Sequence, residues 1–129
     1  MLMKVFPHGT GDGDRPVRYL IREDVPSRIA RPPEVLRGDP KLTAELINSI
    51  ERRWKFTSGV LAWHPDDDVN EAQARDVMDA FECVAFAGLD TDQRHILWVR
   101  HRHAGHHELH FLIPRMELSS GKDFNACPP

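Results

Sequence analysis

Residues 94–118 read RHILWVRHRHAGHHELHFLIPRMEL, and this stretch determines most of what the sequence predicts about the fold. Residues 94–103 and 107–118 are each typical of a β-strand, and Ala104-Gly105 between them is typical of a turn. The stretch therefore predicts a β-hairpin.

The spacing of the polar residues predicts which side chains of the hairpin share a face. Side chains alternate between the two faces of a strand, so Glu108 and His110 point the same way. The other face carries the apolar side chains expected in the core, which are Leu109, Phe111 and Ile113. A two-residue loop would pair residue 103 with 106 and place His101 opposite Glu108. A three-residue loop with a bulge at Gly105 would shift this register by one residue.

In the first of these registers, His101, Glu108 and His110 converge from two rigid strands. Two imidazoles and one carboxylate suit a divalent metal with open coordination positions, and the carboxylate favours a hard ion such as Mg²⁺ or Mn²⁺. The alternative is a polar, solvent-facing side of the hairpin with no bound ion. Three further histidines, His103, His106 and His107, are expected near the turn, where they would compete as ligands.

The rest of the chain predicts an α/β (α+β) domain with a mainly antiparallel sheet flanked by helices. Strands are expected over residues 2–6 and 56–63, and helices over 15–22, 40–53 and 69–86. Asp39-Pro40 is typical of an N-cap followed by proline at the first helical position. Proline-rich residues 25–40 are expected to form an irregular connection.

Periodicity also predicts the buried faces of the three helices. They are Val17, Leu20 and Ile21 in the first, Leu42, Leu46 and Ile50 in the second, and Val69, Val77, Met78, Phe81 and Val84 in the third. Asp68 with Glu71 resembles a capping box at the start of the third helix, and Gly88 is expected to end it. Trp63 and Trp98 fall within predicted strands and are expected in the core.

Composition limits the class of protein. The chain has 129 residues, of which 40% are hydrophobic and 29% charged, as in a globular domain. It has no long apolar run and no signal-peptide pattern, so we expect a cytoplasmic protein without membrane insertion. Cys83 and Cys127 match no metal-binding spacing and fit a reducing compartment.

The charge is unevenly distributed along the chain, although its net value is −3. Residues 1–55 carry eleven basic and eight acidic residues, whereas residues 56–129 carry six and twelve. A nucleic-acid or phosphate partner therefore suits the first half better, unless these charges only solvate the surface. The acidic run Asp66-Asp67-Asp68 is interpreted as a helix N-terminal cap and not as a metal site.

Two features near the N-terminus leave two interpretations open. The glycine-rich residues 9–14 are either a flexible turn or a loop that approaches a phosphate closely, although they lack the lysine of a P-loop. Tyr19 is the only tyrosine, and it is either a core residue or a nucleophile. A nucleophilic tyrosine needs a base, a metal or cationic neighbours, and Arg15, Arg18 and Arg22 are available for phosphate or phenolate.

Residues in both halves of the chain resemble a known protein family. The segment His107-Glu108-Leu109-His110-Phe111-Leu112-Ile113-Pro114-Arg115, with Gly121-Lys122 and Asn125 after it, is similar to the plasmid mobilisation relaxases of the HUH endonuclease superfamily. The glycine-rich segment followed by Tyr19 resembles the motif that holds the family's nucleophilic tyrosine. The resemblance extends from about Gly9 to Pro129 and implies the palm-like fold of these relaxases.

The sequence departs from the family pattern in two respects. Glu108 stands where most relaxases have histidine, as in the His-Glu-Asn branch of colicin plasmids, yet the third position here is His110. The family's domain usually continues beyond the point that corresponds to Pro129. Residues 1–129 are therefore interpreted as a relaxase or nickase domain that is truncated at its C-terminal end.

The resemblance implies an enzyme that nicks one strand at a plasmid transfer origin. Tyr19 would be the nucleophile that forms a 5′-phosphotyrosyl intermediate, and His101, Glu108 and His110 would hold the divalent ion. Single-stranded DNA would need basic and stacking side chains, which are expected among Arg15, Arg18, Arg22, Arg52, Arg53, Trp54, Lys122 and Asn125. The alternative for Trp54 is a core residue at a helix end. Accessory mobilisation proteins and a coupling protein are the further partners implied.

Three other functions fit the same residues. A rolling-circle replication initiator would use the same chemistry. A metal-dependent hydrolase or phosphodiesterase would use the same ligands with a water nucleophile, and Tyr19 would then be dispensable. A decayed relaxase would be a non-catalytic module that binds DNA or metal.

Overall fold

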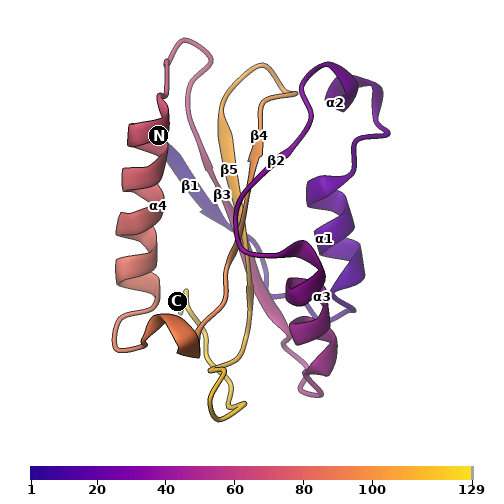
Figure 1. Ribbon diagram of the computed structural model, residues 1–129, viewed down its shortest axis with the longest axis vertical. Helices are drawn as coiled ribbons and strands as arrows, with labels where there is room; N and C mark the ends of the chain where they lie inside the picture. Colours follow the sequence, from indigo (N-terminus) through magenta and orange to yellow (C-terminus); the bar gives the residue numbers. More distant parts are fainter. Residues whose placement is uncertain (129) are drawn as a thin grey trace.

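The computed structural model describes residues 1–128 as one antiparallel sheet between two layers of helices (Figure 1). In chain order the elements are β1 (Leu2–Val5), α1 (Asp14–Ile21), α2 (Pro26–Ala30), β2 (Glu34–Arg37), α3 (Pro40–Ser49), β3 (Phe56–Ala62), α4 (Glu71–Ala85), the short 3₁₀ helix η1 (Thr91–Gln93), β4 (Leu97–His101) and β5 (Glu108–Pro114). The predicted α+β class with a flanked antiparallel sheet is confirmed.

The sheet has the strand order β1-β3-β5-β4-β2, and every neighbouring pair within the described residues is antiparallel. β4 and β5 form the predicted hairpin, in which His101 lies opposite Glu108 and Val99 opposite His110. The loop of residues 102–107 reverses the chain at Gly105, whose φ of +87° suits glycine. Of the two registers that the sequence left open, the one that pairs His101 with Glu108 is correct, but both strands are shorter than predicted, and residues 103 and 106 lie in the loop instead of pairing.

Each face of the sheet has its own hydrophobic cluster because the strand residues alternate. Helix α4 packs Ala74, Met78 and Ala85 against one face, where Leu109, Phe111 and Ile113 point as predicted, together with Trp98. Helices α1 and α3 cover the other face, where Val17, Leu20, Ala44 and Ile47 meet Leu97, Val99 and Leu112. Figure 1 shows α4 on one side of the sheet and α1 and α3 on the other. His101, Glu108 and His110 belong to the α1 side.

The predicted end and the predicted buried face of helix α3 need correction. Helix α3 starts as predicted, with the Asp39 side chain accepting from the N–H groups of Lys41 and Leu42, but it ends at Ser49 and not at residue 53. Its buried residues are Thr43, Ala44 and Ile47, whereas Leu42 is 43% exposed. Ile50, the residue after the helix, is buried as predicted. Helix α3 packs against α1 as well as against the sheet. Its buried face is therefore rotated about the helix axis relative to the face that carries Leu42 and Leu46.

The N-cap of helix α4 lies two residues later in the chain than predicted. It is Asn70, which accepts from the backbone N–H of Gln73 while the Gln73 side chain accepts from the N–H of Asn70. Asp68 with Glu71 is therefore not the capping box, because the preceding chain first makes a turn in which Asp67 binds His64. Val84, predicted to be buried, is 81% exposed. Gly88, with φ of +87°, follows the helix as predicted.

Residues 25–40 are more regular than predicted. They form α2, with Pro26 at its first turn, and the edge strand β2, which pairs with β4. Tertiary pairing with β4 provides the hydrogen bonds that the local proline-rich sequence does not suggest. None of the helices in residues 1–128 is long and apolar enough to cross a bilayer.

Candidate functional site

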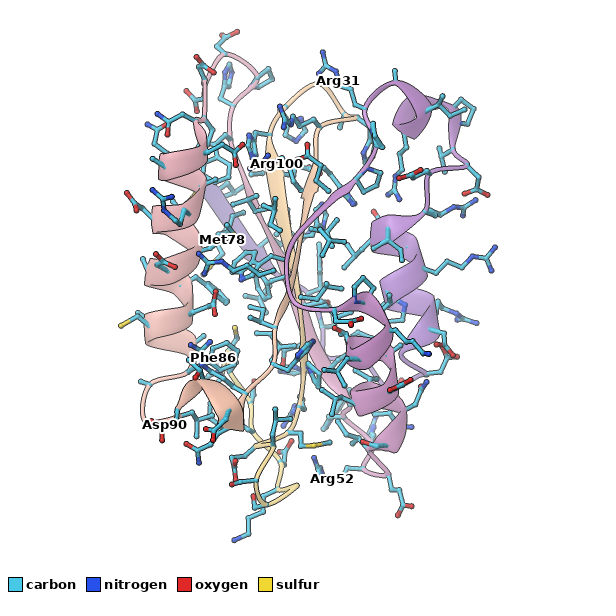
Figure 2. All side chains as sticks on the ribbon, viewed as in Figure 1. Arg31, Arg52, Met78, Phe86, Asp90 and Arg100 are labelled. Atoms are coloured by element: carbon cyan, nitrogen blue, oxygen red, sulfur yellow. The ribbon has the colours of Figure 1, made fainter. Side chains whose placement is uncertain are left out.

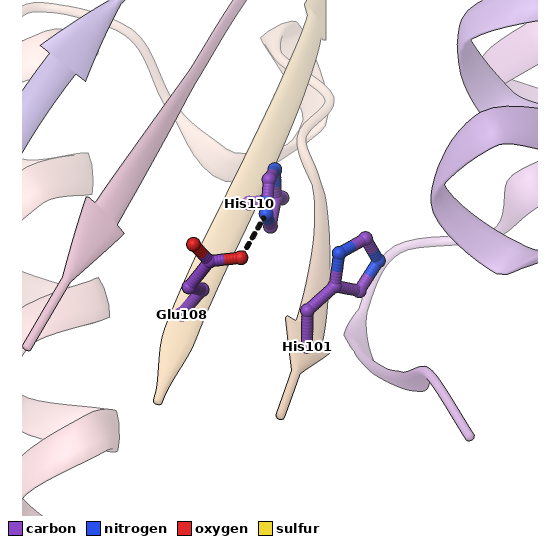
Figure 3. A group of neighbouring side chains, drawn as sticks. All are labelled: His101, Glu108 and His110. Atoms are coloured by element: carbon purple, nitrogen blue, oxygen red, sulfur yellow. Dashed lines mark hydrogen bonds and ion pairs between the residues drawn. The ribbon is translucent and has the colours of Figure 1, made fainter. Parts of the chain in front are cut away.

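The three predicted ligands meet on the α1 face of the sheet, near the hairpin loop. Each of His101, Glu108 and His110 offers one ligand atom, and these atoms lie within 4.8 Å of one another. Figure 3 shows His101 projecting from the end of β4 and the other two from β5. The register that pairs residues 101 and 108 puts all three on one face, and the central strands fix their backbone positions.

Hydrogen bonds orient these side chains. Nε2 of His110 lies 3.0 Å from one carboxylate oxygen of Glu108, and Nε2 of His106 lies 2.8 Å from the other. Nε2 of His101 lies 2.7 Å from the backbone oxygen of Leu20. A carbonyl oxygen only accepts, so His101 carries its proton on Nε2 and leaves Nδ1 with a free lone pair. Metal-bound histidines commonly have such an outer hydrogen bond, which fixes the tautomer and the ring orientation.

Burial sets the charge state of the group. His101 is 1% exposed, and burial lowers its pKa to about 4. Burial also lowers the pKa of His110. The pKa of Glu108 is raised by burial, but hydrogen bonds from His110 and His106 outweigh this and place it below its ordinary value. At neutral pH the group thus offers neutral imidazoles and a carboxylate, which are the forms that bind a metal ion.

Tyr19 lies beside this group and not in the core. It is 58% exposed on α1, and its ring centroid is 6.4 Å from that of His101. The next residue in the chain, Leu20, is buried against the sheet and accepts the His101 hydrogen bond. Of the two interpretations of Tyr19, the core residue is therefore wrong. The structure places an accessible phenol next to the candidate ligands.

The three extra histidines lie in the loop of residues 102–107, as predicted. His106 binds Glu108, and the ring of His103 lies 5.0 Å from that of His101 between centroids. His107 packs edge-on against Trp63, with 5.3 Å between the centroids. The buried atoms Nδ1 of His103 and Nε2 of His107 have no hydrogen-bond partner in the described part of the chain.

The predicted DNA-contacting residues fall into two groups. Arg15 and Arg18 lie on α1 with Tyr19, and Arg22, the C-cap residue of this helix, pairs with Asp24 at 2.8 Å. The other group, Arg52, Arg53, Trp54, Lys122 and Asn125, lies near the opposite end of the sheet, where Arg52 donates to the carbonyl oxygens of Gly121 and Arg115.

The separation of the second group follows from the strand register. Chain positions just before Phe56 adjoin Pro114, six residues along β5 from Glu108. At 3.3 Å per residue this is about 20 Å from the ligands. Figure 2 shows Arg52 at the end of the molecule opposite Arg31 and Arg100. Trp54 is 39% exposed, and the Arg53 guanidinium carbon lies 4.6 Å from its ring centroid, so a stacking surface exists there, away from the ligand group.

One residue near the site has no signal in the sequence. Arg28 lies in α2 within the segment predicted to be irregular, and it is only 4% exposed. Its guanidinium carbon lies 5.2 Å from the centroid of the Tyr19 ring. Arginines are frequent throughout the first half of the chain, so nothing in the sequence distinguishes Arg28 from the others. Only the packing of α2 beside α1 brings it to Tyr19.

The glycine-rich segment serves the packing of α1. Gly13 is the N-cap of α1, and its N–H donates to the Asn48 side chain at 2.7 Å. A Cβ atom at Gly13 would lie 2.7 Å from the carbonyl oxygen of Ala44 and 2.8 Å from Cβ of Ile47. Glycine here therefore lets α1 and α3 approach closely, which positions the helix that carries Tyr19.

Two curated proteins are similar to this chain. Over 122 residues, 95% of the chain, it is 44% identical to cryptic plasmid protein C of Neisseria gonorrhoeae and 38% identical to DNA relaxase MbeA of Escherichia coli. The chain spans 58% of the length of the first relative and 23% of the second. No family model and no solved structure matches it. The resemblance to plasmid mobilisation relaxases is thus confirmed for the stretch that this chain shares with a named DNA relaxase.

Proposed function

We propose that this chain is the strand-nicking domain of a plasmid mobilisation relaxase, which cuts one DNA strand at a transfer origin. The observation that supports this most is the hydrogen bond between Leu20 and His101, because it ties the helix of Tyr19 to the candidate metal ligands at 2.7 Å. The similarity to DNA relaxase MbeA supports the same function.

The donor set fits a divalent cation. His101, Glu108 and His110 would hold Mg²⁺ or Mn²⁺ through two neutral nitrogens and a carboxylate oxygen, and the ion would neutralise charge on the scissile phosphate and orient it. These residues sit on two adjacent strands, so the chain itself holds the ligands in place before any ion binds.

The reaction proposed for Tyr19 is a transesterification. The Tyr19 oxygen attacks phosphorus, a tyrosine–phosphate ester bond forms, and the phosphorus–O3′ bond breaks. The phenol loses its proton to solvent, and the leaving 3′ oxygen gains one. One phosphate ester replaces another and no water is consumed, so the free 3′-OH can attack the phosphotyrosine and rejoin the strand.

The remaining residues would bind the DNA. Arg15 and Arg18 on the helix of Tyr19, and Arg22 at its C-cap, would contact phosphates close to the cut. Arg52, Arg53 and Trp54, with Lys122 and Asn125, would contact single-stranded DNA far from the cut, since the chain just before Phe56 lies about 20 Å from the ligands and Arg52 donates to the backbone oxygen of Gly121. Accessory mobilisation proteins and a coupling protein are proposed as partners of the complete relaxase.

The experiment is an adduct assay on a denaturing gel. The protein is mixed with single-stranded oligonucleotides that tile both strands of its own plasmid or element, with Mn²⁺ or Mg²⁺. We expect a slower protein band that nuclease treatment removes, and no such band with Tyr19→Phe or His110→Ala. Cleavage that survives Tyr19→Phe would refute the tyrosine mechanism in favour of a metal-dependent phosphodiesterase. The absence of both adduct and cleavage would favour a non-catalytic binding module.

A further inference from the structure

Arg28 holds the end of the helix that carries Tyr19. Its Nη1 donates to the backbone oxygen of Tyr19 at 2.6 Å and to that of Arg22 at 3.1 Å. The last carbonyl groups of a helix lack partners within the helix, so a buried guanidinium is an effective cap here. The contact also reaches across from α2, which lies beside the end of α1 (Figure 1).

The same guanidinium contacts the ring of Tyr19. Its central carbon lies 5.2 Å from the ring centroid, within the range of a cation–π contact, which is about 6 Å. The backbone and the side chain of Tyr19 are thus held by one residue. Such a double contact restricts where the phenol oxygen can lie relative to His101, whose ring is 6.4 Å away.

The charge of Arg28 is not neutralised by a carboxylate. Two other buried arginines, Arg100 and Arg115, pair with Glu71 and Asp123 at 2.8 Å. Arg28 is as buried as these, yet it forms no ion pair within residues 1–128. A buried and uncompensated cation is costly to the fold, and an arriving anion relieves that cost.

Arg28 also lies near the ligand group. Its Nη1 donates to the carbonyl oxygen of Tyr19, and the next carbonyl oxygen, that of Leu20, accepts the hydrogen bond from His101. A phosphate bound by these ligands would lie in the field of the same cation.

We infer that Arg28 is a positioning residue for Tyr19, and that its unpaired charge favours a DNA phosphate beside the Tyr19 ring. This inference rests on the proposed function, in which Tyr19 is the nucleophile. Arg15, Arg18 and Arg22, the cations that the sequence suggested for this role, are exposed, whereas Arg28 is held rigidly by its contacts with Tyr19 and Arg22.

The test compares Arg28→Met and Arg28→Lys with the control Arg75→Met, which removes an exposed arginine from α4 on the other side of the sheet. Tyr19 is the only tyrosine, so a ring-labelled sample gives the ¹H–¹³C signals of this one ring. In Arg28→Met we expect displaced ring signals and adduct formation slowed by about tenfold or more in a single turnover at saturating Mn²⁺ and DNA.

Arg28→Lys keeps the charge and a donor, and we expect it to recover part of the rate. Mn²⁺ binding by Arg28→Met should be at least as tight as in the wild type, because a cation has been removed near the imidazoles. A general loss of structure in Arg28→Met would weaken Mn²⁺ binding instead. In that case the Tyr19 ring signals and the adduct rate of Arg28→Lys test the inference. Arg75→Met should match the wild type in every measurement.

Two results separate this inference from the proposed function. A folded Arg28→Met with wild-type ring signals and a wild-type rate would overturn the inference while the proposed function stands. If the wild-type protein forms no adduct, the proposed function fails. The ring signals of Tyr19 then decide alone whether Arg28 positions it.

Discussion

The imidazole of His101 donates a hydrogen bond from Nε2 to the backbone oxygen of Leu20 at 2.7 Å, across 81 positions of sequence. This bond links β4 to the last turn of α1, and Leu20 is the neighbour of Tyr19. A displacement of α1 would move the hydrogen-bond acceptor of His101, and a rotation of the imidazole would break its bond to the helix. The positions of the candidate nucleophile and of this candidate ligand are therefore coupled.

Replacement of Glu108 by Gln should weaken divalent metal binding. The amide keeps the size of the side chain but removes the negative charge that a hard ion prefers. Even the loss of an outer hydrogen-bond partner of a ligand lowers affinity by about 10- to 100-fold, so we expect a loss of at least about tenfold. Calorimetric titration with Mn²⁺ measures it, with Glu51→Gln, an exposed site, as the control. Equal affinity in both variants would place the ion elsewhere.

Gly59→Ala should destabilise the protein. A Cβ atom at Gly59 would lie 2.5 Å from the backbone oxygen of Lys4 and would overlap the ring of Phe111, which packs over β3. Overpacking of this kind typically costs about 1–3 kcal/mol. Urea unfolding followed by circular dichroism measures the change. Gly11→Ala, where the added methyl meets only open space, should change the unfolding free energy by less than about 0.5 kcal/mol.

Asn70→Ala should cost about 1 kcal/mol of unfolding free energy, because it removes the acceptor for the N–H of Gln73. Asp68→Ala should leave the unfolding free energy within about 0.5 kcal/mol of the wild type, since Asn70 caps the helix. Thermal and urea unfolding of the two variants compare them directly. A larger loss with Asp68→Ala than with Asn70→Ala would mean that α4 starts earlier.

His95 should make the protein less stable as the pH falls. Its Nε2 lies 2.6 Å from the Thr43 hydroxyl, which itself donates to the Asp39 carbonyl. Burial lowers the pKa of His95 below 6.5, against the opposing attraction of Asp39. The unfolded chain therefore takes up this proton at a higher pH than the folded protein does. The contribution to stability is complete above pH 6.5 and is lost as the pH falls toward the lower pKa of the folded state.

The measurement for His95 is the slope of the unfolding free energy against pH between 7 and 5. His95→Gln should flatten this slope, whatever its effect on stability at pH 7. His64→Gln, at a histidine whose side chain is 69% exposed, serves as the matched control substitution. A wild-type slope in His95→Gln would show that its proton uptake does not differ between the two states.

The hairpin could be predicted from the sequence because its signals are local. Alternation in β5 separates Glu108 and His110 from Leu109 and Phe111, and a turn at Gly105 then fixes the partner of Glu108. The ligand group follows directly from that register. Tyr19 could not be placed in the same way, because the residues around it fit both a buried and an exposed side of a short helix.

The errors occur where distant contacts decide the structure. β2 depends on pairing with β4, and Arg28 reaches Tyr19 only once α2 has packed beside α1. The capping error has a different cause. Both Asp68 with Glu71 and Asn70 with Gln73 fit the same spacing rule, and the turn formed by His64 and Asp67 selects the second.

The two strands that carry the ligands are interior strands of the sheet. β5 pairs with β3 and β4, and β4 pairs with β5 and β2, so neither ligand strand lies at an edge. Fraying of a sheet starts at its edges and loops, whereas the amide protons of central strands exchange with solvent mainly when the whole domain opens. His110 lies inside β5 and therefore keeps its place as long as the domain is folded, whereas His101 and Glu108 are the residues of β4 and β5 next to the hairpin loop. An ion bound by all three would stabilise the folded state and would also hold together the two strand ends beside the loop.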